Sequence, residues 1–247
     1  MSLPEAVWYQ ARCAPARVAI ERMHEADGAP EQVAYGALAA AVAAVAIEVE
    51  SAFAGRGGPR KVGLIAANSP EWVTADLALQ LGGATEIPIP LGFSFEQAGS
   101  MIQHADLVLV DRTGAQALAH WRSLGLAYDR PTLDITRIAA HPPGAAVVTD
   151  VWGRMLGQRS ADVDFIAKII HTSGTTSRPK GVRIRASALA IQTGALSALV
   201  GPEGVARYLS LVPLSLLIEQ LCAIHLPLSN GGTVVLLPKS VAPFTGG

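Results

Sequence analysis

Apolar and polar positions alternate between two spacings along the whole chain. Apolar residues recur at helical spacing between residues 33 and 53, and the glycine-rich stretch 55–58 ends this pattern, which predicts a helix. Short apolar runs predict strands at 61–67, 84–90, 107–110, 163–170, 207–212 and 233–237. Helical patterns beginning near residues 68, 94, 113, 187 and 215 follow these runs. Alternation of this kind favours an α/β fold with a largely parallel sheet.

Two of the expected helices begin with capping signals. Asn68-Ser69-Pro70-Glu71 supplies a cap residue, a proline for the first helical position and a carboxylate for the first turn. Ser94 and Gln97 have the spacing of a capping box. These signals predict helix starts immediately after Ser69 and Ser94.

Composition excludes several classes of protein. The chain has 247 residues, of which 50% are hydrophobic, so it is long and apolar enough to bury a large core. Its 19 Lys and Arg residues nearly balance 20 Asp and Glu residues, which argues against a nucleic-acid partner. The six histidines show no spacing typical of metal ligands, so no metal site is expected.

Cysteine use and apolar segments point to a cytoplasmic protein. Cys13 and Cys222 are too few for a disulfide scaffold, and we expect two buried thiols that form no disulfide. The N-terminus lacks a basic segment followed by an apolar run, so no signal peptide is expected. The apolar stretch 36–49 is too short to cross a bilayer, and 211–238 is interrupted by polar and turn residues. We therefore expect no membrane span.

One segment concentrates groups that suit a phosphate ligand. An apolar run ending at Ile170 leads into hydroxyl side chains, a glycine at 174 and Lys180. Glycine allows backbone N–H groups to approach an anion closely, and hydroxyls and a lysine add donors and positive charge. The spacing differs from a Walker A loop, since Lys180 precedes Gly181 and lies six residues after Gly174. From composition alone, an ordinary polar loop with a surface lysine stays an equal alternative.

The same segment resembles a family signature. The residues TSGTT at 172–176 followed by PKGV at 179–182 resemble the phosphate loop of the AMP-forming ligases, which include acyl-CoA synthetases, firefly luciferase and peptide-synthetase adenylation domains. Further stretches resemble family segments in the same order, and these lie at 35–38, 61–72, 82–90, 211–215 and 231–238. The resemblance covers roughly residues 8–238.

The resemblance implies a fold and a reaction. It implies stacked, largely parallel sheets with flanking helices, with a first subdomain over 1–160, the start of a second over 161–247, and no small C-terminal domain in this chain. It also implies a two-step ligase. ATP with Mg²⁺ activates a carboxylic acid to an acyl-adenylate, and the thiol of coenzyme A or of a carrier-protein pantetheine then displaces AMP.

The family's site residues are carried over position by position. The implied phosphate contacts are Thr172, Ser173, Gly174, Thr175, Thr176, Lys180 and Gly181. The substrates supply both nucleophiles, so no catalytic side chain is expected in this chain. Leu216 and Glu219 stand at positions that line the acyl channel, which favours a fatty or other apolar acid.

Departures from the family pattern support an alternative function. Ser177 replaces a usual glycine, Arg185-Ala186 replaces a Thr-His pair, and Leu216 replaces a histidine. The alternative is a degenerate, non-catalytic module that binds nucleotide or a partner. Family members usually exceed 500 residues and carry adenine, ribose and Mg²⁺ contacts later in the chain. We therefore expect that residues 1–247 alone do not complete thioester formation.

Other polar and aromatic residues receive structural interpretations. Asp76 is expected on a helix surface, and Lys168 is expected to point to solvent or to a sheet edge. His171 adjoins the loop and is a candidate for either a structural or a site role. The remaining histidines are expected to be structural or exposed. The four tryptophans are expected to pack in the core, and these are Trp8, Trp72, Trp121 and Trp152.

Overall fold

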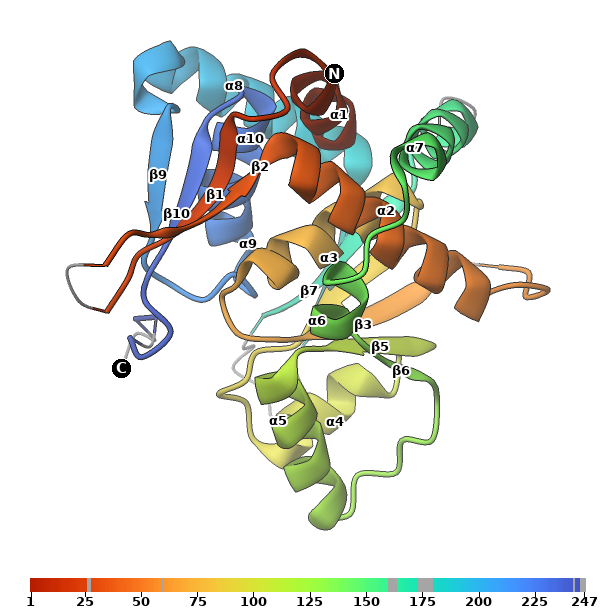
Figure 1. The fold of residues 1–247 in the computed structure, drawn as a ribbon. Coiled ribbons are helices and arrows are strands. Elements are labelled where there is room, and N and C mark those ends of the chain that lie inside the picture. Colours follow the sequence, from red (N-terminus) through yellow and green to blue (C-terminus); the bar gives the residue numbers. More distant parts are fainter. Residues whose placement is uncertain (26–27, 59, 160–163, 173–179, 242, 245–247) are drawn as a thin grey trace.

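The fold places two sheets and their helices in layers (Figure 1). The computed structural model describes residues 1–25, 28–58, 60–159, 164–172, 180–241 and 243–244. The described strands are β1 (Val18–Arg22), β2 (Glu31–Ala34), β3 (Lys61–Ile65), β4 (Thr85–Pro88), β5 (Leu107–Val110), β6 (Thr132–Asp134), β7 (Ile166–Thr172), β8 (Lys180–Arg185), β9 (Arg207–Ser210) and β10 (Thr233–Leu236). The described helices are α1 (Leu3–Cys13), α2 (Tyr35–Ala52), α3 (Pro70–Leu81), α4 (Phe95–Ile102), α5 (Arg112–Ser123), α6 (Ile135–Ala139), α7 (Ala145–Arg159), α8 (Ala186–Gly204), α9 (Leu217–Glu219), the π-helical turn η1 (Gln220–His225) and α10 (Leu226–Ser229).

The sheets confirm the expected α/β class. One sheet has the strand order β6-β5-β3-β4-β7-β8, and all its neighbouring strands are parallel except β7 and β8. The other has the order β2-β1-β10-β9, in which β1 and β2 are antiparallel. Each sheet draws strands from both sides of residue 160, and the division into subdomains there stays a prediction.

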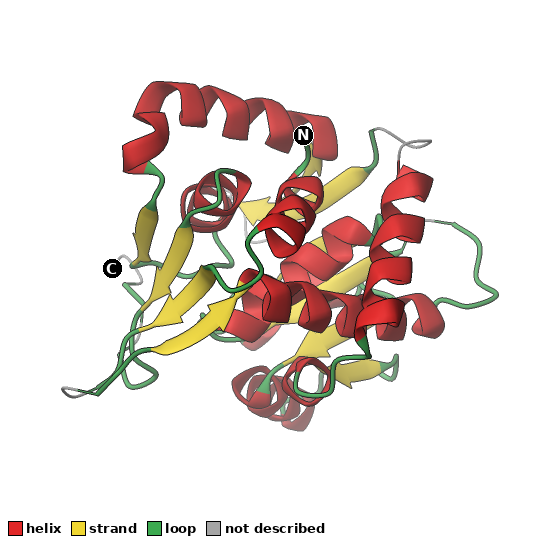
Figure 2. Ribbon diagram, turned by 45° about the horizontal axis from the view of Figure 1, so that its top comes forward, coloured by secondary structure: helices red, strands yellow, loops and turns green. Residues whose placement is uncertain are grey.

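The main hydrophobic core lies between the two sheets. It joins apolar residues of β1 and β10 to those of β3 and β5 through α2 and α3. Every residue of α3 except Glu71 is buried, including the polar Thr74, Asp76 and Gln80. A second cluster packs α4 and α5 against the opposite face of the six-stranded sheet. Figure 2 shows the helices both between and outside the sheets.

Helix α2 is long and apolar enough to cross a membrane by composition, but half of it is buried inside the protein. Its neighbours are α1, α3, α6 and α7, so its apolar side chains form part of the core. Trp152 of α7 stacks on Trp8 with a 5.3 Å centroid separation and donates its indole N–H to Ala39 O at 2.9 Å. Trp72 and Trp121 are buried, so the packing role expected for the tryptophans is confirmed.

Several elements differ from the sequence-based expectations. The segments α1, β1, β2, β6, α6 and α7 were not predicted. The single helix expected from residue 215 is instead three consecutive helical pieces, α9, η1 and α10. Both cysteines are unpaired as expected, but Cys13 is exposed, so the prediction that both thiols are buried is wrong.

Candidate functional site

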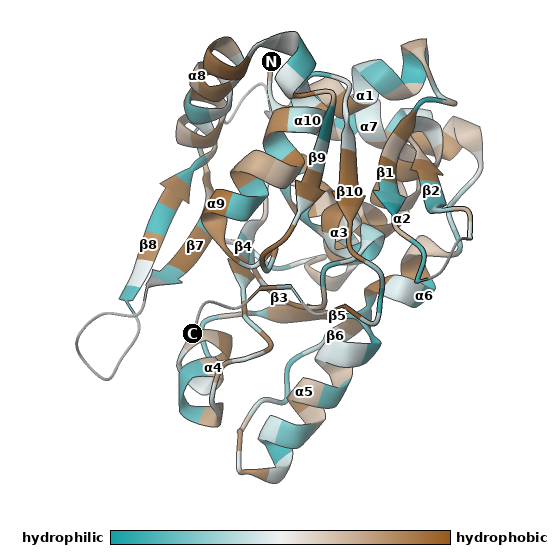
Figure 3. Ribbon diagram, turned by 90° about the vertical axis from the view of Figure 1, so that its left-hand side faces the viewer, coloured by the Kyte–Doolittle hydropathy of each residue, from teal (hydrophilic) through white to brown (hydrophobic). Residues whose placement is uncertain are grey.

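The candidate phosphate loop connects the two strands of a hairpin at the edge of the six-stranded sheet (Figure 3). β7 and β8 pair from Ile166 with Arg185 to Thr172 with Lys180. Lys180 and Gly181 therefore lie in β8, and His171 and Thr172 lie in β7. The sequence had predicted a loop over residues 171–181, and both of its ends are wrong. The remaining expected phosphate contacts, Ser173, Gly174, Thr175 and Thr176, lie outside the described residues.

The hairpin separates Lys180 from His171. Residues that pair across two antiparallel strands share a face, and successive residues alternate between faces. Lys180 is three positions from Arg183 along β8, so the two lie on opposite faces. His171 pairs with Gly181 and Ile169 pairs with Arg183, which places these residues on the face away from Lys180. The structure therefore brings Lys180, but not the His171 side chain, to the face shared with Ile170 and Val182.

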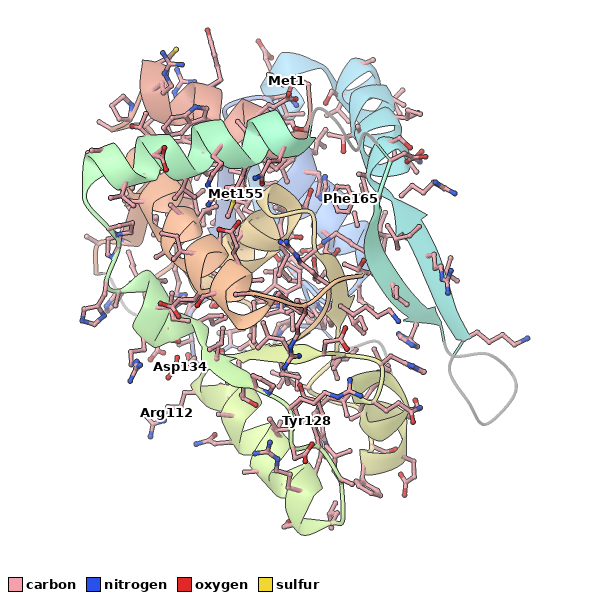
Figure 4. The ribbon with its side chains drawn as sticks, turned by 90° about the vertical axis from the view of Figure 1, so that its right-hand side faces the viewer. Met1, Arg112, Tyr128, Asp134, Met155 and Phe165 are labelled. Atoms are coloured by element: carbon pink, nitrogen blue, oxygen red, sulfur yellow. The ribbon has the colours of Figure 1, made fainter. Side chains whose placement is uncertain are left out.

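His171 instead lines a cavity of about 820 Å³. Cationic side chains of Arg60, Lys61 and Arg183 line the same cavity. Burial and the charge of nearby His104 lower the pKa of His171, so its imidazole is neutral at neutral pH. Figure 4 shows two further lining residues, Met155 on α7 and Phe165 just before β7.

Gly181 makes the close packing of this face possible. A Cβ added at Gly181 would lie 2.9 Å from Ile169 Cγ2 and 3.2 Å from His171 Nε2. Any side chain at position 181 therefore has to displace one of these two neighbours. The glycine of the sequence signature has a packing role here that is independent of phosphate contact.

We expect Gly181→Ala to lower the free energy of unfolding by about 1–3 kcal/mol, because the added methyl overpacks the hairpin face. Chemical denaturation measures this change. Gly194→Ala is the control, since a Cβ at this exposed position in α8 meets nothing within 4 Å. A Gly181→Ala protein as stable as the wild type would contradict the packing role.

Asn68 fixes the segment that carries the acyl-channel candidates. Its side-chain amide donates to Val212 O at 2.8 Å, and its Oδ1 accepts from Leu214 N at 2.8 Å. The Glu219 carboxylate accepts from Leu211 N at 3.1 Å and is buried, whereas Leu216 is 42% exposed. The structure thus places Leu216 at the surface, whereas the Glu219 side chain points to the backbone of the preceding segment at Leu211.

Asn68→Ala should lower the free energy of unfolding by about 1–3 kcal/mol, because two hydrogen bonds to the 211–214 backbone are lost. Asn68→Asp retains the acceptor for Leu214 N but sets a carboxylate oxygen against Val212 O, so its loss should be at least as large as that of Asn68→Ala. Thermal unfolding of the two variants measures the difference. Equal stability of all three proteins would show that this tether is not needed.

A buried polar cluster adjoins the hairpin on the core side. The Lys168 ammonium contacts Asp76 Oδ1 and Glu86 Oε2, and all three side chains have no exposed surface. Gln80 donates to Asp76 Oδ1 at 2.9 Å and lies 3.3 Å from His225 Nε2. The expectations that Asp76 lies on a helix surface and that Lys168 points to solvent or an edge are therefore wrong.

Burial and mutual charge set the protonation states of the cluster. Burial, with the nearby Asp76 charge, raises the pKa of Glu86 well above its ordinary value. Burial would also raise the pKa of Asp76, but the Lys168 ammonium and the hydrogen bond with Glu86 lower it to about 2. Burial lowers the pKa of His225 to about 4. These shifts favour a positive Lys168, a negative Asp76 and a protonated Glu86, and they leave His225 neutral at neutral pH.

The described residues contain no group of three or more His, Cys, Asp or Glu side chains that could hold a metal ion. Lys180 is exposed at the start of β8 and carries a positive charge of the kind that binds phosphate oxygens.

The fold and the hairpin together define an α/β protein with a candidate nucleotide-phosphate loop between two antiparallel strands. The family model of the AMP-binding enzymes matches residues 7–246. The chain therefore belongs to the AMP-binding enzyme family.

Individual relatives agree with this assignment. The chain is 29% identical over 177 residues to the AMB antimetabolite synthetase AmbB of Pseudomonas aeruginosa, covering 71% of this chain and 12% of AmbB. It is similar in fold to the fatty acid AMP ligase of Legionella pneumophila, with a TM-score of 0.72, 17% identity, and 96% of this chain and 40% of the ligase covered. The four-domain nonribosomal peptide synthetase AB3403 gives a TM-score of 0.70 at 21% identity, with 98% of this chain and 16% of that protein covered. The chain thus spans less than half the length of these three relatives.

Proposed function

We propose that this chain is part of a cytoplasmic ligase that uses ATP to activate a carboxylic acid as an acyl-adenylate and then transfers the acyl group to a thiol. The observation that carries the proposal is the β7–β8 hairpin, which connects Thr172 to Lys180 through the signature residues of the AMP-binding family. The solved complex of the Legionella ligase with an acyl adenylate and pyrophosphate supports the same chemistry for this fold.

In this proposal the hairpin holds phosphate and performs no covalent step. Lys180 and the hydroxyls of residues 172–176 neutralise and orient the β- and γ-phosphates while the acid reacts at the α-phosphate. ATP would supply the adenylyl group, with pyrophosphate as the leaving group, and Mg²⁺ would accompany the nucleotide. Positioning and fixed positive charge are the means by which such loops accelerate phosphoryl and adenylyl transfer.

The acid and the acceptor form the finer part of the proposal. We propose a fatty or other apolar acid, because the residues around Glu219 along the chain, among them Leu214, Leu217 and Leu221, are apolar. The acceptor thiol belongs to coenzyme A or to a carrier-protein pantetheine. A carrier-linked acceptor is supported by the similarity in fold to the four-domain nonribosomal peptide synthetase AB3403.

A degenerate nucleotide-binding module is the second candidate. Leu216 is an exposed apolar residue at a position where a histidine is usual, and the neighbouring Glu219 carboxylate is occupied by Leu211 N. A module of this kind would bind ATP without acid-dependent turnover.

Acid-dependent exchange of labelled pyrophosphate into ATP separates the two functions. The 247-residue chain is assayed alone and with the rest of the domain supplied in trans, using decanoate, benzoate and glycine as acids. The ligase predicts exchange with decanoate or benzoate in the complemented sample. ATP binding without exchange under any condition would support the non-catalytic module instead.

A further inference from the structure

The buried cluster around Lys168 joins four separate elements of the fold. Asp76 and Gln80 come from α3, Glu86 from β4, Lys168 from β7 and His225 from η1. Within the described residues, the ladder between β4 and β7 is registered at Glu86 with Lys168. Lys168 therefore has two roles in β7: it pairs with β4 in the sheet, and its side chain forms the ion pairs of the cluster.

Lys168 lies close to the candidate nucleotide site along the chain. It precedes Thr172, where β7 ends, by four residues, which is about 13 Å of extended strand. A charge pair with no exposed surface holds its position much more tightly than a surface pair, because breaking it leaves an unpaired charge in the core. The cluster consequently fixes the position of β7, the first strand of the hairpin.

The other end of the cluster reaches the helix beside the acyl-channel candidates. The path runs from Lys168 to Asp76, from Asp76 to Gln80 at 2.9 Å, and from Gln80 to His225 at 3.3 Å. His225 ends η1, the π-helical turn that directly follows Glu219. Such turns are rare and commonly occur at functional sites. One continuous buried network thus runs from the phosphate-loop strand to the acyl-channel helix.

The charges of the network balance in one protonation state. Two carboxylates face one ammonium, so a second ionised carboxylate would leave a net buried charge. Asp76 Oδ2 and Glu86 Oε1 have no other hydrogen-bond partner, which leaves them available to share the proton of a neutral Glu86. A neutral Glu86 is therefore the state in which the cluster holds together.

We propose that the Lys168 cluster is a positioning unit. It ties β7, the strand before the phosphate loop, to η1, the helical turn that directly follows the acyl-channel candidates Leu216 and Glu219, so that the two segments become ordered and open together. The identity of the candidate subsites beside these segments rests on the proposed function. The tie itself is a property of the fold and is tested without any substrate.

Ionisation of Glu86 should loosen both ends of the tie. The charged groups that face Glu86 are Lys168 of β7 and Asp76 of α3. Asp76 in turn accepts from Gln80, which lies 3.3 Å from His225 of η1. A pKa raised by folding stabilises the protein at pH values below the ordinary pKa of the carboxyl, and this contribution is lost as pH rises through the folded-state pKa. Glu86→Gln keeps the neutral form at every pH and should remove this dependence.

Amide hydrogen exchange on the 247-residue chain tests the tie between pH 6 and pH 9, with rates corrected for the intrinsic effect of pH. We expect protection of β7–β8 and of residues 217–229 to fall in parallel as pH rises from the ordinary pKa of a carboxyl towards the folded-state pKa of Glu86, by at most about tenfold for each pH unit, and to level off above it. Peptides from α5 should show no such fall. Glu86→Gln should give constant protection, whereas Glu50→Gln, which removes a surface pair with Arg154, should behave like the wild type.

A second variant cuts the tie without leaving a buried charge. Asp76→Asn combined with Lys168→Met keeps the cluster neutral, so it should fold while its two segments exchange at unrelated rates. A wild type whose two segments lose protection independently, or a Glu86→Gln protein that follows the wild-type pH dependence, would overturn the proposal. ATP binding by the same samples reports separately on the proposed function: absent binding contradicts that function, while the exchange data still decide the tie.

Discussion

Replacing Lys168 with methionine should lower the free energy of unfolding by about 3–5 kcal/mol. The side chain has no exposed surface and contacts both Asp76 and Glu86. Methionine fills similar space, but it leaves the ionised Asp76 buried without a counter-charge. Urea denaturation at pH 7 measures the loss.

The matched control is Lys239→Met, because Lys239 is exposed beyond the last strand. It should change stability by less than about 0.5 kcal/mol. A Lys168→Met protein within 1 kcal/mol of the wild type would mean that Asp76 is neutral in the fold, and the charge balance described for the cluster would be wrong.

Lys180→Ala should weaken binding of Mg·ATP by about ten- to a hundredfold. Lys180 is exposed and is the first residue of β8, where it pairs with Thr172, the first residue of the signature. Removing one charge-assisted hydrogen bond of this type costs about 1.5–3 kcal/mol. Isothermal titration calorimetry of the 247-residue chain measures the change directly.

Arg183→Ala is the control for this substitution. Arg183 lies on the same strand but on the opposite face, where it lines the cavity shared with His171. Its removal deletes the same charge and should change ATP binding less than threefold, since solvent and salt screen an exposed charge that does not contact the ligand. Equal losses for the two variants would assign the effect to net charge rather than to Lys180.

The local sequence was sufficient to predict the helix starts and the central strands. Ser69 Oγ accepts from Trp72 N at 3.0 Å, and the reciprocal bonds between Ser94 and Gln97 are present, so both predicted helix starts are confirmed. Apolar runs predicted the central strands because parallel strands buried on both faces have few polar positions. The strands β2 (EQVA) and β6 (TLD) were missed because they carry too few apolar residues to form a recognisable run. The strand β1 (VAIER) was missed although it begins with three apolar residues, because so short a run does not distinguish a strand.

The buried cluster could not be predicted from single positions. An isolated Asp76 or Lys168 is costly to bury, so each alone favours the surface. The two are 92 residues apart, and they become compatible with the core only when the sheet brings β7 beside β4. A signal did exist, since Val73, Ala75, Leu77 and Leu79 surround Asp76 along α3 and favour burial of the helix, although Gln80 one turn later is polar.

The central claim is that the end of the β7–β8 hairpin binds the phosphates of a nucleotide. Titration of pyrophosphate and Mg·ATP into the ¹⁵N-labelled 247-residue chain tests it most directly. The account predicts saturable amide shifts concentrated at residues 170–172 and 180–182, with both ligands affecting the same amides and with α5 unchanged. Saturable shifts confined to the cavity lined by Arg60, Lys61 and His104, or no shifts at millimolar ligand, would contradict it.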